Sequence, residues 1–173
     1  MAYTYSKIAT YTVGSGGVAN VSFLNIPQTY TDLVVKVSAR DTKATTTGNN
    51  GFNLRINGAT SGYTGKQLYG GQGTGFGSIN RNNTNIGTLT SANDTANTFM
   101  SGEIYFPNYT SSDSKSHSVD SVSDTNSTTS YELDFVGKLY STTSPITSLT
   151  FLCDTDSFAQ YSTFHLYGVK AEV

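Results

Sequence analysis

One segment of the chain, Tyr131-Glu-Leu-Asp-Phe-Val-Gly-Lys-Leu139, alternates between apolar and polar side chains with a two-residue period. Its large apolar residues and Gly137 fall on the odd positions, whereas Glu132, Asp134 and Lys138 fall on the opposite face. Successive side chains of a strand point to opposite faces of a sheet, so this pattern indicates a half-buried β-strand. No segment of the chain shows a sustained 3.6-residue apolar period, which argues against a helical fold.

The same alternation recurs along the rest of the chain. Further segments with strand character are residues 6–13, 19–24, 31–40, 52–57, 66–69, 98–106, 116–123, 146–153 and 163–170. Clusters of Gly, Asn, Ser or Thr separate them, and the pair Asn57-Gly58 predicts a tight turn because both residues tolerate positive φ. The sequence therefore predicts an all-β fold: an antiparallel two-sheet β-sandwich, jelly-roll-like, with about 8–10 strands in a single domain over residues 1–173.

The composition excludes several classes of protein. Ser, Thr, Asn and Gly together make up 80 of 173 residues, whereas charged residues make up 13% and the formal net charge is −2. A chain this poor in basic residues does not match a nucleic-acid binder, which neutralises phosphates with Lys and Arg. A single Cys excludes an intramolecular disulfide framework. We find no secretory signal and no membrane span in the sequence, so we expect the protein to fold in a reducing cytoplasm.

Three stretches read as long loops: residues 42–51, 70–97 and 109–115. The second contains the glycine run Gly70-Gly-Gln-Gly-Thr-Gly-Phe-Gly77. A phosphate-binding loop requires a defined Gly-Lys-Ser/Thr pattern, or a helix directly after the glycines, and the run has neither. We therefore interpret it as a flexible loop and expect no cofactor.

Few residues suggest chemistry. Cys153 lies in an apolar string and is interpreted as a buried small hydrophobe rather than a nucleophile. Asp154 and Asp156 could contribute ligands to a hard cation such as Ca²⁺, but no nearby cluster supplies the further oxygen ligands, and an ordinary acidic turn is the favoured interpretation. His117 and His165 lie in no metal-binding pattern, and His165 is expected to point away from the core. We predict no catalytic and no metal-binding residues.

Aromatic residues around the glycine run are the candidates for contact with a partner. Tyr63 and Tyr69 flank the run and Phe76 lies within it. Exposed aromatic rings among Asn, Ser and Gly are typical of recognition surfaces, and such rings also stack on sugars. These three residues are therefore predicted to contact a partner protein or a glycan. The competing interpretation is that they pack inside the sheets, as Tyr often does in strands.

Three segments match sequence elements of a known group of proteins. They read Ile26-Pro-Gln-Thr-Tyr-Thr-Asp-Leu-Val34, Phe52-Asn-Leu-Arg-Ile-Asn-Gly58 and Phe158-Ala-Gln-Tyr-Ser-Thr-Phe-His-Leu-Tyr-Gly-Val-Lys170. They resemble, in order, the IPxTYTdL, fxirfNGdtgxnY and fxxyStFxLYGik elements of small structural proteins of tailed bacteriophages, many from marine or cyanobacterial phages. Tyr63 falls near the final Tyr of the second element, and the chain departs from it at Ala59, where an acidic residue is common.

This resemblance implies a non-enzymatic virion component with a jelly-roll module, made in the cytoplasm of a bacterial host. Its expected partners are other virion proteins, either the major capsid protein or tail proteins, and further copies of itself, with a trimer expected by analogy. Low charge is compatible with that setting, because identical copies then pack closely without mutual repulsion.

The compact length and the absence of a long fibrous segment favour a capsid decoration (cement) protein on the head surface. A tail or tail-fibre component, or a module that binds host-surface glycans, is the alternative. A free carbohydrate-binding module would be expected to carry an attached catalytic domain or a secretion signal. An enzyme would be indicated by glycan cleavage that depends on a single carboxylate.

Overall fold

The computed structural model describes residues 3–44, 50–71, 75–126 and 131–171, and these residues form twelve strands and no helix. The strands are β1 (Tyr3–Thr12), β2 (Asn20–Phe23), β3 (Asp32–Ala39), β4 (Asn50–Ile56), β5 (Tyr63–Gly71), β6 (Gly75–Asn80), β7 (Asn85–Leu89), β8 (Met100–Phe106), β9 (Lys115–Asp124), β10 (Tyr131–Tyr140), β11 (Leu149–Cys153) and β12 (Thr163–Ala171). Within this part of the chain, no helix is long and apolar enough to cross a membrane.

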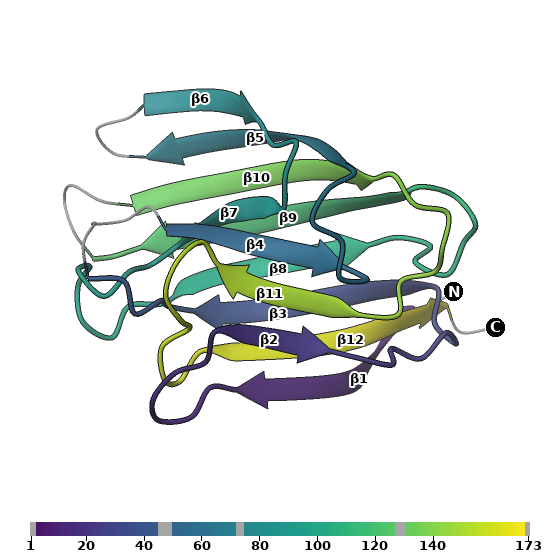
Figure 1. Cartoon of the computed structure of the whole chain (residues 1–173), viewed down its shortest axis with the longest axis horizontal. Coiled ribbons are helices and arrows are strands. Elements are labelled where there is room, and N and C mark those ends of the chain that lie inside the picture. Colours follow the sequence, from purple (N-terminus) through teal and green to yellow (C-terminus); the bar gives the residue numbers. More distant parts are fainter. Residues whose placement is uncertain (1–2, 45–49, 72–74, 127–130, 172–173) are drawn as a thin grey trace.

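The strands form two antiparallel sheets packed face to face (Figure 1). The large sheet has eight strands in the order β1-β12-β3-β8-β9-β10-β5-β6, and the small sheet has four in the order β2-β11-β4-β7. The chain crosses from one sheet to the other at each step from β1 to β4, and again between β7 and β8 and between β11 and β12. Such repeated crossing between two sheets is jelly-roll connectivity. The predicted sandwich is confirmed, with more strands than expected. The unexpected strands are β6 and β7. β9, β10, β5 and β6 extend the large sheet past β8, and β5 and β6 reach beyond the small sheet in Figure 1.

The core lies between the sheets and follows the sequence pattern in most strands. The alternating apolar residues of β3, β4 and β8 all point inward and are buried, as the alternation predicts. Phe52 and Phe151 stack with ring centroids 5.7 Å apart, and Phe164 packs edge-on to Phe158 at 5.0 Å. This aromatic cluster joins β4 and β11 of the small sheet to β12 of the large sheet.

β10 is a strand, as predicted, but it buries its polar face. Asp134, Val136 and Lys138 point inward, whereas Leu133 and Phe135 lie on the outer face and are half exposed. Alternation identifies a strand without specifying which face meets the core. The segment that precedes and forms β7 covers this part of the sheet and supplies hydrogen-bond partners for the inward polar groups, which explains the orientation.

All ten predicted segments contain a strand, including residues 66–69, which belong to a longer β5. The prediction of one long loop over residues 70–97 is wrong, because β5 ends, β6 forms and β7 follows within it. The glycine run is correspondingly a hairpin rather than a loop: Gly70 lies in β5 and Gly77 in β6, and only residues 72–74 lie outside the described part of the run. Residues 45–49 of the predicted loop at 42–51 also lie outside the described residues, and β4 begins at Asn50.

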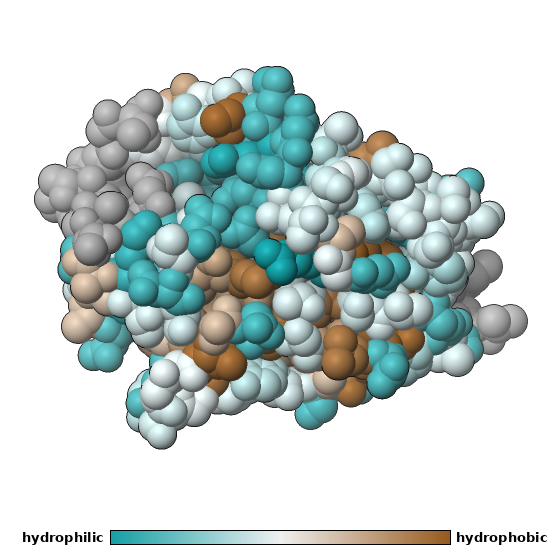
Figure 2. Space-filling view, viewed as in Figure 1, coloured by the Kyte–Doolittle hydropathy of each residue, from teal (hydrophilic) through white to brown (hydrophobic). Residues whose placement is uncertain are grey.

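The turn predicted at Asn57-Gly58 is confirmed, since both residues have positive φ, 51° and 76°. The Asn57 side chain fixes the turn to the start of β11, because its Oδ1 accepts the N–H groups of Thr147 at 2.8 Å and Ser148 at 3.1 Å. Figure 2 views the molecule from the side of the small sheet, where hydrophilic residues cover much of the surface. The surface described next lies on the opposite side, on the outer face of the large sheet.

Candidate functional site

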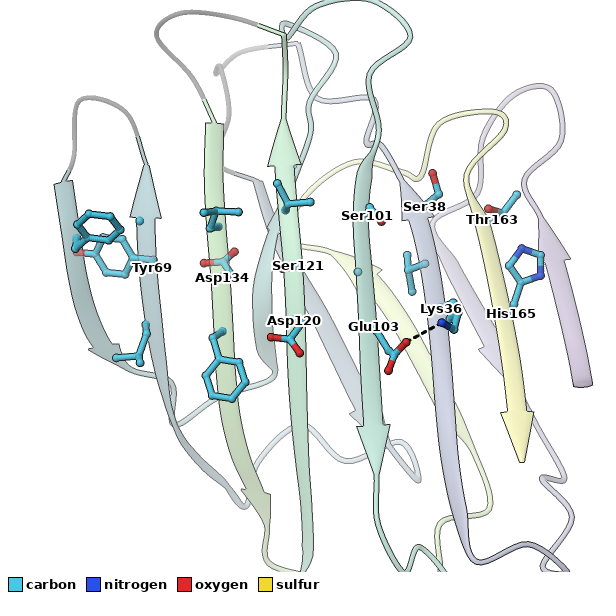
Figure 3. Close-up of a pocket in the computed structure, with 18 residues that line it drawn as sticks. Lys36, Ser38, Tyr69, Ser101, Glu103, Asp120, Ser121, Asp134, Thr163 and His165 are labelled. Atoms are coloured by element: carbon cyan, nitrogen blue, oxygen red, sulfur yellow. Dashed lines mark ion pairs between the residues drawn. The ribbon is translucent and has the colours of Figure 1, made fainter. Parts of the chain in front are cut away.

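The outer face of the large sheet carries a shallow hollow of about 780 Å³. Strands from β6 at one end to β12 at the other contribute its lining, so the hollow runs across most of the sheet (Figure 3). Its volume is in the range of ligand-binding clefts in proteins. The lining divides into an apolar part on β6, β5 and β10 and a polar part on β9, β8, β3 and β12.

The apolar part, which we call the outer apolar patch, consists of Leu68, Phe76, Leu133 and Phe135. Their exposed fractions are 53%, 94%, 51% and 49%, respectively. The register makes them neighbours: Phe135 pairs with Leu68, while Leu133 and Phe76 both pair with Gly70 from its two sides. Large apolar side chains gathered on one exposed sheet face mark an interaction surface more often than chance exposure does.

Two glycines position the aromatic rings of the β5–β6 hairpin. A Cβ at Gly70 would lie 2.6 Å from the ring of Phe76, and a Cβ at Gly77 would lie 2.5 Å from the hydroxyl of Tyr69. Phe76 therefore lies over Gly70 on the outer face, while Tyr69, on the alternate pleat of β5, lies over Gly77. An aromatic ring that covers a cross-strand glycine restores packing that the glycine lacks. The glycine run thus supports ring placement rather than phosphate binding.

The polar part of the hollow contains one row of charged groups. Lys36 Nζ donates to Glu103 Oε2 at 2.9 Å, and this ion pair raises the pKa of Lys36 (Figure 3). Asp120 pairs across the ladder with Glu103 on the other side, and His165 pairs with Lys36. His165 Nδ1 lies 3.1 Å from Thr10 Oγ1 and faces outward, as predicted. The outer face thus carries the Lys36–Glu103 ion pair with Asp120 and His165 on the strands at either side of it.

On the inner face of β10, Asp134 is buried and both of its carboxylate oxygens accept hydrogen bonds. Its Oδ2 accepts the backbone N–H of Thr88 at 3.0 Å and the Thr88 hydroxyl at 2.8 Å, and its Oδ1 accepts from the amide of Gln67. Arg81 donates to Gln67 from the other side. Burial, with the neighbouring charge of Asp134, raises the pKa of Glu132 to about 7. This network holds β7 against β10 and so fixes which face of β10 is outward.

Two further ionisable groups are buried between the sheets. Lys138 Nζ donates to the carbonyl of Asn85 at 2.8 Å and to that of Asn83, and burial lowers its pKa to about 8. His117 stacks on Phe106 at 5.2 Å, and neither of its ring nitrogens has a hydrogen-bond partner among the described residues. Burial, together with the charge of Lys138, lowers the pKa of His117 to about 3, so the imidazole is neutral. A neutral buried imidazole that stacks on Phe106 packs like an aromatic residue.

The structure separates the three predicted contact residues. Phe76 is almost fully exposed, and Tyr69 is half-buried at the hollow. Tyr63 is 3% exposed, and the prediction of a surface contact is wrong for it. Its hydroxyl accepts the N–H of Ile56 at 2.8 Å and donates to the carbonyl of Ala59 at 3.3 Å, so Tyr63 anchors the turn after β4. The sequence analysis did not identify Leu68, Leu133 and Phe135 as surface residues, because the alternation of apolar side chains in their strands is equally typical of a face that packs against the core.

The residues considered for cation binding or thiol chemistry have structural surroundings. Asp154 Oδ1 accepts the amide of Asn53 at 2.6 Å, and Asp156 has a positive φ of 69° in the turn that follows β11. No group of three or more His, Cys, Asp or Glu residues among the described residues has a metal-binding arrangement. Cys153 packs against the core, and burial raises the pKa of its thiol, which keeps it unreactive.

Comparison of the chain with protein-family models, curated proteins and solved structures gave no match.

Proposed function

We propose that this protein is a non-enzymatic structural component of a bacteriophage virion, a decoration protein that sits on the head and binds through the outer face of its large sheet. The observation that carries the proposal is the outer apolar patch: Leu68, Phe76, Leu133 and Phe135 are adjacent and exposed. The phage setting rests on the sequence elements at residues 26–34, 52–58 and 158–170.

The outer apolar patch is costly to leave in water. Each half-exposed Leu or Phe forgoes part of the roughly 1.5–3 kcal/mol that full burial contributes. Soluble monomers rarely keep such side chains together unless a partner covers them. The patch also has the anatomy of an interface, with apolar residues beside a rim of hydroxyl and charged groups that includes Ser101 and Asp120.

Charge supports the same proposal. The outer face contains the Lys36–Glu103 pair, which is neutral as a unit, and the whole chain has a net charge of only −2. A surface of this kind binds through contact area and hydrogen bonds rather than through long-range attraction, and its binding is weakly dependent on salt. Many copies on one shell then provide avidity even if each contact is modest.

The test is to locate the protein on particles of the phage that encodes it. Antibodies raised against the purified protein are used for immunogold labelling, and quantitative mass spectrometry gives the copy number relative to the major capsid protein. Label spread over the head, at a copy number comparable with that of the capsid protein, is the expected result. Label confined to the tail at a handful of copies would reject decoration, and unlabelled particles would reject a virion role altogether.

A host-surface glycan-binding module on the tail is the second candidate. It is favoured by one observation: the hollow has aromatic rings at one end and, at the other, a row of hydroxyl groups from Ser101, Ser38 and Thr163, which pair in sequence across three strands. Rings that stack on sugar faces and hydroxyls that bind their edges are the chemistry of glycan recognition. Binding of the purified protein to isolated host glycans, abolished by Phe76→Ala, would favour this candidate. A lack of binding, together with label on the head, would remove it.

A further inference from the structure

The two edges of the large sheet differ in how they are protected from pairing with another strand. β1, at one edge, contains an irregularity in its register between Lys7 and Ala9 and carries the charge of Lys7. Bulges and lysines are the features that keep edge strands from pairing further. β6, at the other edge, reads Gly75-Phe-Gly-Ser-Ile-Asn80, with no charge, no proline and an unbroken register of six pairs with β5.

The backbone groups that β6 presents to its open side follow from one hydrogen bond. The N–H of Arg81 donates to the carbonyl of Gly65 at 2.9 Å, so residue 81 faces β5. In an antiparallel ladder, alternate residues direct their N–H and C=O groups to the same neighbour. Residues 79, 77 and 75 therefore also face β5, and the N–H and C=O groups of Phe76, Ser78 and Asn80 point away from the sheet.

We propose that a second copy of this chain occupies that edge, with the two β6 strands antiparallel about a two-fold axis at Ser78. In this register Ser78 faces Ser78 of the second copy, and Phe76 faces Asn80. Every outward N–H and C=O group of both strands then finds a partner, whereas a shift of two residues in either direction leaves some of them unpaired. A contact of this kind is isologous and closes as a dimer.

Side chains on the outer face fit this register. Phe76, 94% exposed in the single chain, would lie opposite Asn80 of the second copy and beside Lys66, which pairs with Asn80. Within one chain Lys66 Nζ already donates to Asn80 Oδ1 at 3.1 Å, which lays the lysine stem along the sheet. Because the Phe76 ring lies over Gly70 on the β5 side, the side of the ring that faces the open edge is free, and Asn80 of the second copy would cover it. The outer apolar patches of both copies would face the same side.

Side chains on the other face of the hairpin fit as well. Ile79, 43% exposed, would lie opposite Gly77 of the second copy. Because the Tyr69 ring covers Gly77, the isoleucine of each copy would meet the tyrosine of the other. Both exposed apolar side chains of β6 therefore gain a cover, and no charged groups are brought together. This complementarity of the strand with itself is the reason for choosing a second copy over a strand from a different protein.

The first test is the mass of the purified protein in solution, measured by sedimentation over a range of concentrations. A dimer of twice 18.5 kDa is expected. Ser78→Pro removes an N–H that faces the open edge and none that bonds β5, so it should raise the dissociation constant at least about tenfold while the hairpin stays folded. Ser78→Val, which keeps the N–H, is the matched control and should remain dimeric. A persistent monomer, a trimer, or a dimer that tolerates Ser78→Pro would overturn the proposal.

Cross-linking tests the register itself. Directly opposed residues at hydrogen-bonded positions have Cα atoms about 5.5 Å apart, within the range that a disulfide spans. Ser78→Cys should therefore form a covalent dimer on mild oxidation, whereas Ser116→Cys on β9 should not. If Ser78→Pro proves to be unfolded by circular dichroism, Ile79→Lys replaces it, because two buried ammonium groups would separate the copies. Equal cross-linking at both cysteine positions would contradict the register. The dimer is measured without phage particles, so its failure would leave the proposed virion role untouched.

Discussion

The two halves of the large sheet place their apolar residues on opposite faces. In β3 and β8 most apolar residues point to the small sheet, with Val34 and Tyr105 as exceptions, whereas in β10 Asp134 and Lys138 point in and Leu133 and Phe135 point out. The difference follows from which side chains and backbone groups pack against the inner face of each half. Aromatic rings of β4 and β11 cover the first half, and carbonyl and hydroxyl groups of residues 83–88 cover the second. A buried polar face with partners leaves the apolar face free to bind something else.

Removing the buried carboxylate of Asp134 should have the largest effect on the stability of this part of the sheet. Asp134→Ala deprives the N–H and hydroxyl of Thr88 and the amide of Gln67 of their acceptor, and we expect a loss of about 3 kcal/mol in the free energy of unfolding. Urea denaturation monitored by circular dichroism measures it. Asp120→Ala, on the outer face of the neighbouring strand, is the control and should change stability by no more than about 0.5 kcal/mol. Equal effects of the two changes would refute the inward orientation of Asp134.

His117 should make the protein sensitive to acid. Its pKa is about 3 in the folded protein and 6.5 when unfolded, so the unfolded chain binds the extra proton between these values. The stability that His117 contributes is therefore complete above pH 6.5 and is lost as the pH falls towards 3, at up to about 1.4 kcal/mol per pH unit. His117→Leu should flatten this dependence and leave stability at pH 7 nearly unchanged.

Unfolding curves of both proteins at several pH values measure this difference. Glu132 acts with the opposite sign, because a carboxyl whose folded pKa is raised to about 7 favours folding at low pH and loses that contribution as the pH rises from 4.5 through 7. Glu132→Gln should therefore remove a loss of stability that develops as the pH rises from 4.5 to 7, and leave the dependence below pH 4.5 unchanged. A His117→Leu variant with the acid sensitivity of the wild type would show that the imidazole is solvated.

Tyr63 offers a smaller test of the boundary between core and surface. Tyr63→Phe leaves the ring in place but removes the hydroxyl that joins Ile56 to Ala59, and a loss of about 1 kcal/mol is expected from thermal or urea unfolding. Tyr161→Phe, an exposed tyrosine in a loop, is the comparison and should fall within about 0.5 kcal/mol of the wild type. If the Tyr63 hydroxyl were on the surface, the two substitutions would change the free energy of unfolding by similar small amounts.

The smallest effect on stability is expected at the outer apolar patch. Phe135→Ser should change the free energy of unfolding by less than about 1 kcal/mol, because the ring is already half in water. Val136→Ser, one residue along and fully buried, should cost about 3 kcal/mol. If the patch is the docking face, only Phe135→Ser yields a folded protein that no longer binds particles stripped of the wild-type protein. Retained binding would move the contact elsewhere.

Much of the fold could be predicted from side-chain alternation, because period-two patterns in segments such as 31–40 and 163–170 reflect the pleat directly. β6 and β7 were missed because glycines replace the alternating residues in one and all five residues are buried in the other. The orientation of β10 could not be predicted, since it depends on partners 46 residues away, as in the bond from Thr88 to Asp134. Phe76 is exposed, as its prediction as a contact residue requires, whereas Tyr63, predicted on the same grounds, is a buried anchor of the turn after β4.

The outer face of β10 is open in the free protein, and under the proposed function it is covered when the protein is bound to the particle. Thiol labelling of Phe135→Cys and Val136→Cys, each in a Cys153→Ala background, tests it on adjacent residues of opposite faces. We expect rapid labelling of Phe135→Cys in the free protein, strong protection once the protein is bound to particles, and slow labelling of Val136→Cys throughout. Slow labelling of Phe135→Cys in the free protein would contradict the fold, and equally fast labelling on the particle would contradict the docking face.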